Sequence, residues 1–216
     1  MQKPRMFLIG SIIAVGIISI FIFWIAPKDR YHDMADMKNE EDGIVDNSIP
    51  KLNIDGNEDD EELIMKIITA RDGEEYLAKA LELLPNIDFD RLEHVYGEGS
   101  VLELLEWLSE RRIEGEANIM VLIDMADEFY REESSKFAEI IAKTYRLDKL
   151  KFIRALAKTP EKVNIMALAL HELRVYDESD ESLPRDLELI INSRELTDEE
   201  REVGILLLST YTECGT

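Results

Sequence analysis

An uncharged run of 21 residues, from Met6 to Ala26, constrains the fold of this chain more than any other feature. In a helix that rises about 1.5 Å per residue, such a run extends roughly 30 Å, the thickness of the hydrocarbon core of a bilayer. The run has no polar face at any helical period, so a half-buried helix on a water-exposed domain is a poor alternative. We therefore expect residues 1–27 to form a transmembrane helix that holds the rest of the chain at one membrane face.

A signal peptide that is removed after export is the competing interpretation of this run. Such peptides have an apolar stretch of about 7–15 residues, followed by small residues at a cleavage site. The run here is longer, and it ends at the bulky Trp24 with Pro27 close behind. These features favour a signal-anchor that remains in the membrane.

The basic residues that flank the run indicate its orientation only weakly. Lys3 and Arg5 precede it, and Lys28 and Arg30 follow it, so the positive-inside rule gives almost equal weight to the two sides. A short basic stretch before an apolar run is typical of an export signal. We expect the N-terminus inside and residues 28–216 outside, as in a single-pass protein of the bacterial inner membrane with a periplasmic domain.

Charge and cysteine content exclude several classes of function. The whole chain has a formal net charge of −22 and residues 1–30 carry +3, so residues 31–216 carry about −25. A domain this acidic is repelled by nucleic acids and by anionic lipid headgroups. Cys214 is the single cysteine, which excludes an internal disulfide and leaves open a cross-link between two copies.

The rest of the chain divides into a tether and a helical domain. Residues 28–58 are rich in Asp, Asn, Gly and Lys and contain mostly isolated apolar residues, which is typical of a flexible acidic tether. From residue 59 to residue 216, apolar residues recur with helical spacing. Capping boxes are indicated at Ser100–Glu103 and at Thr197–Glu200, and Thr159 before Pro160 is a further N-cap candidate.

These signals predict an all-α domain with short loops and no strand. The ten predicted helices are 59–72, 74–84, 88–96, 100–113, 117–131, 134–146, 148–158, 160–175, 184–193 and 197–211. No residue pattern recurs at a period of 34 or 40 residues, and the tetratricopeptide signature is absent, so we expect an irregular α-solenoid or a superhelical bundle. Residues 119–123 and 163–170 are apolar almost all round and should be central, with helices on several sides.

The sequence contains no recognisable catalytic or metal-binding motif. There is no G-x-S-x-G and no phosphate-binding loop. Residues 53–62 partly resemble a calcium loop, but Lys51 stands where the first acidic ligand is required. His171 has Val175 four residues later, where a zinc protease needs a second histidine. We expect no catalytic residue, no metal site and no cofactor.

A cluster of seven basic residues within residues 143–162 is the sharper candidate site, and only Asp148 and Glu161 oppose it. An acidic stripe with helical spacing stands elsewhere, at Glu103, Glu106, Glu110 and Glu114. The basic residues, which we call the basic patch, are Lys143, Arg146, Lys149, Lys151, Arg154, Lys158 and Lys162. Either the two charged faces are solvated or neutralise each other within the domain, or the basic patch binds an acidic segment of a protein partner.

Three functions are compatible with these observations. The leading hypothesis is a membrane-tethered, non-enzymatic scaffold or adaptor that binds another protein outside the cytoplasm. The order of span, tether and all-helical body is similar to the plan of membrane-anchored lipase foldases, although the Arg-x-x-Phe-Asp-Tyr motif of that family is absent. This layout suggests an alternative function, in which the chain helps exported proteins to fold. An enzyme would require a pocket with several converging polar groups and a perturbed acid.

Overall fold

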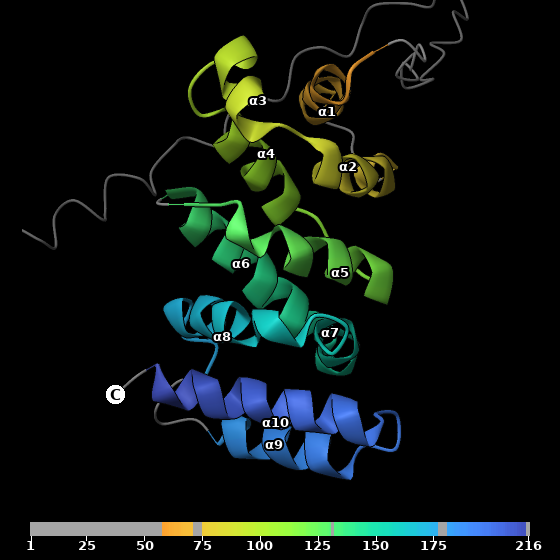
Figure 1. Ribbon diagram of the computed structural model, residues 1–216, viewed down its shortest axis with the longest axis vertical. Coiled ribbons are helices and arrows are strands. Elements are labelled where there is room, and N and C mark those ends of the chain that lie inside the picture. Colours follow the sequence, from red (N-terminus) through yellow and green to blue (C-terminus); the bar gives the residue numbers. More distant parts are fainter. Residues whose placement is uncertain (1–57, 71–74, 131, 177–180, 215–216) are drawn as a thin grey trace, which may run out of the picture. The chain divides into compact units, whose positions relative to one another are not determined.

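Short helices that lie two apart along the chain pack against each other in the computed structural model (Figure 1). The structure describes residues 58–70, 75–130, 132–176 and 181–214, all within one unit that spans residues 50–216. None of the helices in these ranges is both long enough and apolar enough to cross a bilayer. The predicted transmembrane helix and nearly all of the predicted tether lie outside the described residues.

The described residues form ten α-helices and three 3-10 turns, and they contain no strand. The α-helices are α1 (Asp60–Thr69), α2 (Leu77–Leu83), α3 (Phe89–Tyr96), α4 (Ser100–Ser109), α5 (Glu116–Asp124), α6 (Glu132–Leu147), α7 (Lys149–Leu156), α8 (Val163–Glu172), α9 (Ser182–Asn192) and α10 (Asp198–Glu213). The 3-10 turns are η2 (Leu84–Asn86), η3 (Met125–Asp127) and η4 (Pro160–Lys162). Each predicted helix overlaps one of these α-helices, so the all-α prediction is confirmed for this part of the chain.

The capping predictions were right at one capping box and wrong at the other. The Thr197 hydroxyl accepts from the Glu200 amide at 3.2 Å, and the Glu200 carboxylate accepts from the Thr197 amide at 2.7 Å. Ser100 is instead the first residue of α4 and is buried, because Gly99 occupies the N-cap with φ 94°. Thr159 does occupy the N-cap position before Pro160, as predicted, but its side chain makes no capping hydrogen bond.

Several helices end earlier than their sequence patterns predict, among them α5 and α8. Helix α5 ends at Asp124, where η3 follows it, and the chain after η3 buries Phe129 in the core. Helix α8 ends at Glu172 in a Schellman motif, in which the Val175 amide donates to the Leu170 carbonyl at 3.1 Å. Arg174 takes the left-handed position of that motif, with φ 45°.

The helices of even number from α4 to α10 form a continuous series of contacts. Helix α6 lies between α4 and α8, and α8 lies between α6 and α10 (Figure 1). A second series runs through α2, α5 and α7, and α7 also contacts α10, which pairs with α9. Within the first series, α4 buries an apolar stripe formed by Val101, Leu104, Leu105 and Leu108.

Helix α10 approaches its neighbours closely at Gly204. A Cβ added at this glycine would lie 2.9 Å from Cγ2 of Ile190 in α9 and 3.1 Å from Cδ1 of Ile153 in α7. These distances are shorter than ordinary van der Waals contacts between carbons. The absence of a side chain therefore sets how closely α7, α9 and α10 pack.

Helix α8, which contains the apolar residues 163–170, has helices on more than one side, as predicted, but one of its faces is not covered. Met166, Ala167 and Leu170 are buried where α8 contacts α6 and α10. Ile165 and Ala169 are only partly buried, and Leu168 is 56 % exposed. One apolar face of α8 therefore remains uncovered by the described part of the chain.

Candidate functional site

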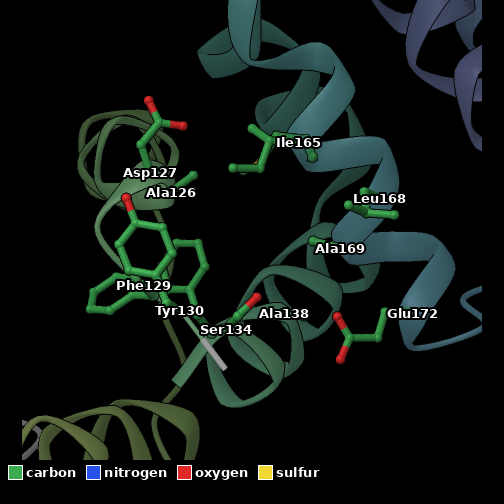
Figure 2. Close-up of a pocket in the computed structure, with 12 residues that line it drawn as sticks. Ala126, Asp127, Phe129, Tyr130, Ser134, Ala138, Ile165, Leu168, Ala169 and Glu172 are labelled. Atoms are coloured by element: carbon green, nitrogen blue, oxygen red, sulfur yellow. The ribbon is translucent and has the colours of Figure 1, made fainter. Parts of the chain in front are cut away.

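The uncovered face of α8 forms one wall of a partly open cavity with a volume of about 430 Å³. The other wall is η3 with the segment after it, and the first two turns of α6 form the floor (Figure 2). We call this cavity the α6–α8 groove. Its lining residues are Ala126, Asp127, Phe129, Tyr130, Ser134, Phe137, Ala138, Ile165, Met166, Leu168, Ala169 and Glu172.

A row of aromatic rings fixes the wall opposite α8. The ring centroid of Phe129 lies 5.2 Å from that of Phe89 in α3 and 4.7 Å from that of Phe137 in α6. Such aromatic pairs contribute about 0.5–1.5 kcal/mol beyond their buried area. Phe129 thus anchors the segment, and Tyr130, which follows it, is left 69 % exposed at the rim.

The wall formed by α8 follows from helical spacing. Ile165, Leu168 and Ala169 are separated by three and four residues, so they share one face of the helix. They project toward Ala126, Phe129 and Tyr130 across the groove (Figure 2). The groove is therefore apolar along both walls.

Two carboxylates border the groove, and no lining residue is basic. Asp127 on η3 forms an ion pair with Lys162, and the Glu172 carboxylate at the end of α8 accepts from the Ser135 hydroxyl at 2.5 Å. Figure 2 places Asp127 and Glu172 on opposite sides of the groove. The rim of an apolar groove thus carries negative charge.

Five residues of the basic patch have partners inside the domain. The ammonium and guanidinium groups reach a helix C-terminus or carboxylates, which reduces the charge that the patch presents to a partner. The contacts are Lys143 to the Ser109 carbonyl at 2.8 Å, Lys149 to Asp186 at 2.6 Å, Lys151 to Asp148 at 2.7 Å, Arg154 to Glu195 at 3.7 Å, and Lys162 to Asp127.

Arg146 and Lys158 differ from the other five. Both are exposed, and neither side chain makes a hydrogen bond or an ion pair with any residue that the structure describes. The seven residues also lie on three separate elements, α6, α7 and η4, and on the turn after α7. The structure thus divides the basic patch into five cations with partners inside the domain and two without a side-chain partner among the described residues.

Residues of the acidic stripe act electrostatically on two lysines, Lys136 and Lys151. The hydrogen bond that Lys136 donates to Glu139 raises the pKa of Lys136 above its ordinary value, and the charges of Glu106 and Glu110 raise it further. The pKa of Lys151 is raised first by Asp148, and Glu114 adds to this rise. Of these two lysines only Lys151 belongs to the basic patch, so Glu114 is the residue of the acidic stripe that acts on the patch here.

A buried polar network, which the sequence analysis missed, connects α9 to three earlier segments. The Asp186 carboxylate accepts from Lys149 Nζ at 2.7 Å and from the Tyr176 hydroxyl at 2.6 Å. The Tyr145 hydroxyl lies 2.5 Å from that of Tyr176. Because Tyr176 donates its proton to Asp186, Tyr145 must donate to Tyr176. The Tyr211 hydroxyl completes the network by donating to the Tyr176 carbonyl at 2.8 Å.

Burial raises the pKa of both inner tyrosines above the ordinary tyrosine value. For Tyr176 the nearby Tyr145 and the hydrogen bond to Asp186 raise the pKa further. For Tyr145 the hydrogen bond to Tyr176 acts in the opposite direction, but burial outweighs it. Both tyrosines therefore stay neutral near pH 7, and neither lines the α6–α8 groove.

A sequence signal for this network exists in the spacing of α9. Leu183, Leu187 and Ile190 mark the apolar stripe, and Asp186 stands within it, three residues after Leu183. A single acid on an apolar stripe requires a buried partner. The partners Tyr145 and Tyr176 are distant in sequence, so the pattern alone does not identify them.

The described residues contain no group of three or more His, Cys, Asp or Glu side chains arranged to hold a metal ion. Part of the calcium-like segment lies outside the described residues. Asp59, which is inside them, caps α1 by accepting from the Glu62 amide at 2.9 Å, and it also pairs with Arg91. His171 packs edge-on against Tyr211, with 5.4 Å between the ring centroids.

Comparisons with protein-family models, with curated proteins and with solved structures find no match to this chain.

Proposed function

We propose that this chain is a membrane-tethered, non-enzymatic module that binds another protein, with its helical domain outside the cytoplasm. The uncharged residues 6–26 support the membrane anchor. The charge of about −25 on residues 31–216 makes nucleic acid and anionic membrane surfaces unfavourable partners. Tethering at a membrane raises the local concentration of the domain, which makes weak contacts effective.

The α6–α8 groove is the observation that carries this proposal. It exposes large apolar side chains, Tyr130 at 69 % and Leu168 at 56 %, on two facing walls. Apolar surface that water covers in the free protein is the feature that a protein partner buries. The two carboxylates at its border already have partners within the domain. This arrangement suits recognition of another protein better than proton transfer in catalysis.

The architecture supports the same function. We propose that the contacts between helices two apart along the chain make this domain an irregular α-solenoid. Solenoids of helix pairs present extended surfaces between successive helices, and they use these surfaces to bind other proteins. The α6–α8 groove lies in such a position.

We also propose that the basic patch contributes a second contact region through Arg146 and Lys158. The side chains of these two cations pair with no other described residue of the chain. An acidic segment of another protein could therefore bind them without first displacing a carboxylate of this domain. The paired cations Lys143, Lys149, Lys151, Arg154 and Lys162 would add to the long-range field. Exposed ion pairs contribute about 1 kcal/mol or less each, so this region sets specificity and encounter rate.

A helper for the folding of exported proteins is the second candidate. Large apolar side chains are exposed on several elements besides the groove, including Leu189 and Ile191 on α9 and Leu206 on α10. Scattered apolar contacts of this kind fit transient binding of unfolded chains. Native purification from membranes separates the two candidates, since a stoichiometric partner supports the module and a mixture of unfolded clients supports the helper.

Protease treatment of intact cells and of spheroplasts tests the location. The proposal predicts that residues 58–216 are protected in intact cells and cleaved in spheroplasts, while the anchor stays in the membrane fraction. Recovery of a chain that begins after residue 26 and floats free of vesicles would contradict the proposal.

Crosslinking tests the binding function in the same cells. A photoreactive residue at Arg146 or Lys158 should capture a protein partner, whereas the same residue at Lys151, which pairs with Asp148, should capture it less efficiently. Equal capture at all three positions would contradict the proposed contact region.

A further inference from the structure

We propose that the α6–α8 groove binds a peptide segment whose bulky apolar side chains are flanked by Lys or Arg. This inference rests on the proposed function and names the chemistry of the partner at the groove. Three properties of the groove support it: its length along α8, its apolar walls and the negative charge around it.

The length of the groove suits side chains from successive turns of a helix or an extended strand. The lining residues of α8 run from Ile165 to Glu172, which corresponds to about 10 Å at 1.5 Å per residue. Apolar anchors of a docked helix recur at three and four residues and reach a groove of this kind from one face. The volume of about 430 Å³ also accommodates several apolar groups.

The apolar walls supply the favourable free energy of binding. Leu168 and Tyr130 lie on opposite walls of the groove (Figure 2) and are mostly exposed. Covering them with apolar side chains removes their surface from water. Buried aromatic and aliphatic anchors of this kind dominate the affinity of most protein interfaces.

The charge around the groove selects the flanking residues of the partner. Asp127 and Glu172 lie on its two sides, and residues 124–133 contain five acids and one base. Lys162 pairs with Asp127 and Lys136 pairs with Glu139, so each of these pairs has no net charge, and the negative excess comes from Glu172 and from the other acids of residues 124–133. Cationic flanks on the peptide therefore gain electrostatic attraction, whereas acidic flanks are repelled.

Fluorescence anisotropy with synthetic peptides tests this inference on the full 216-residue chain in zwitterionic nanodiscs, with empty nanodiscs as the blank. The probe is an amphipathic peptide with Leu at helical spacing and Lys at both ends. The control is a peptide with the same Leu positions and with Glu in place of Lys at both ends. We expect the Lys-flanked peptide to bind at least about tenfold more tightly, and the difference to shrink as salt rises.

Three variants assign the binding to the groove. Leu168→Lys places a cation on an apolar wall and should weaken binding of the Lys-flanked peptide by about tenfold or more. Leu206→Lys, an exposed leucine of α10 that does not line the groove, is the matched control and should change binding less than about twofold. Glu172→Gln should weaken binding by a few-fold and reduce its salt dependence.

Several results would overturn the inference. Equal binding of the Lys-flanked and Glu-flanked peptides, or unchanged binding to Leu168→Lys, excludes the proposed recognition. Binding of 1-dodecanol at the groove with no binding of either peptide indicates a small apolar ligand instead. If Leu168→Lys lowers the melting temperature, Tyr130→Ser on the opposite wall takes its place as the variant that tests binding at the groove.

The outcome also separates this inference from the proposed function. Crosslinking of a partner from Arg146 or Lys158, together with no peptide binding at the groove, would overturn the inference and leave the binding module standing. Peptide binding at the groove, with no partner captured in cells from any position, would support the inference and count against the proposed cellular function.

Discussion

Arg174 and Asp186 show how much a single residue decides in this domain. Arg174 has the only positive φ of a non-glycine residue in the described part of the chain. Asp186 is an acid with 7 % exposure on an otherwise apolar stripe. Both residues break a local preference, and both lie where α8 turns into α9, at the Schellman motif and the buried polar network.

Replacement of Arg174 by glycine should stabilise the domain. A left-handed conformation costs a residue with a Cβ about 1–2 kcal/mol, and glycine avoids most of that cost. Because glycine also increases the entropy of the unfolded chain, we expect Arg174→Gly to raise the free energy of unfolding by about 0.5–1 kcal/mol. Urea denaturation at pH 7 measures this change.

The matched control for that measurement is Arg146→Gly in the last turn of α6. Here the same substitution should lower the free energy of unfolding by about 0.5–1 kcal/mol, because glycine is a poor helix former. If both variants changed the free energy of unfolding in the same direction, backbone strain at Arg174 would not be the cause of the change in Arg174→Gly.

At the scale of elements, the C-terminal helices are held together by two different devices. Gly204 lets α10 approach α7 and α9 without a side chain between them. The buried network places Asp186 of α9 on the hydroxyl of Tyr176 and on the ammonium group of Lys149. The close approach at Gly204 is a steric feature and the network around Asp186 is a polar one, so a separate measurement tests each of them.

Gly204→Ala should destabilise the packing of α10. The added Cβ would lie within 3.2 Å of Ile190 and Ile153. Overpacking of this kind costs about 1–3 kcal/mol, and better helix propensity returns up to about 1 kcal/mol. We expect a net loss of about 1 kcal/mol in thermal or urea denaturation.

A double-mutant cycle with Ile190→Ala checks the steric explanation. If the clash with Ile190 is the cause, the double variant should lose less stability than the sum of the two single variants. Additive losses would assign the effect of Gly204→Ala to something other than this contact.

The buried network should make stability fall at alkaline pH. Because the pKa values of Tyr145 and Tyr176 are raised in the folded state, both keep their protons above pH 10, where unfolded tyrosines release theirs. Their contribution is therefore fully present below about pH 10 and is lost as pH rises toward the folded pKa, by up to about 1.4 kcal/mol per pH unit for each tyrosine.

Urea denaturation at several values between pH 9 and pH 11 measures this loss. Tyr176→Phe should reduce the slope of unfolding free energy against pH, and it should also lower stability at pH 7, because Tyr145 and Asp186 each lose a buried hydrogen bond. Tyr130→Phe changes an exposed tyrosine and serves as the control. An unaltered slope in Tyr176→Phe would contradict the assignment to the network.

At the scale of the whole molecule, charge repulsion is the dominant electrostatic feature. Residues 31–216 carry about −25, and the described ion pairs involve mostly exposed groups, such as Lys79–Glu82 and Arg185–Glu181. Exposed ion pairs contribute little to stability. An excess of like charge destabilises the folded state by self-repulsion.

Added salt should therefore stabilise the domain. Between about 10 mM and 200 mM NaCl the screening length falls from about 30 Å to less than 10 Å, which suppresses long-range repulsion. We expect the melting temperature to rise by about 2–4 °C, equivalent to roughly 1 kcal/mol for a domain of this size. A fall in melting temperature with salt would show that the ion pairs outweigh the repulsion.

Local patterns account for the elements of this protein. Helical spacing of apolar residues predicts each of the ten described helices, because every helix must bury one stripe of its surface. The capping box at Thr197 predicts the start of α10, since its hydrogen bonds involve residues three apart. The capping box at Ser100 fails because the positive φ at Gly97 and Gly99 reshapes the turn before α4.

The candidate site depends on contacts that local patterns do not contain. The apolar sequence of α8 predicts helices on several sides but not which face stays open, and the contacts with α6 and α10 leave Leu168 exposed. The position of Phe129 and Tyr130 depends on rings from α3 and α6, and the partners of the basic patch come from elements up to 41 residues away, as for Arg154 and Glu195.

The sequence by itself determined the helices, the acidic charge and the apolar run, because each depends on residue type and on neighbours within a few positions. Only the tertiary structure decided which apolar face stays open, which cations are paired and which acid is buried. Those properties depend on how the helices pack, and packing brings together residues whose separation along the chain no periodic pattern encodes.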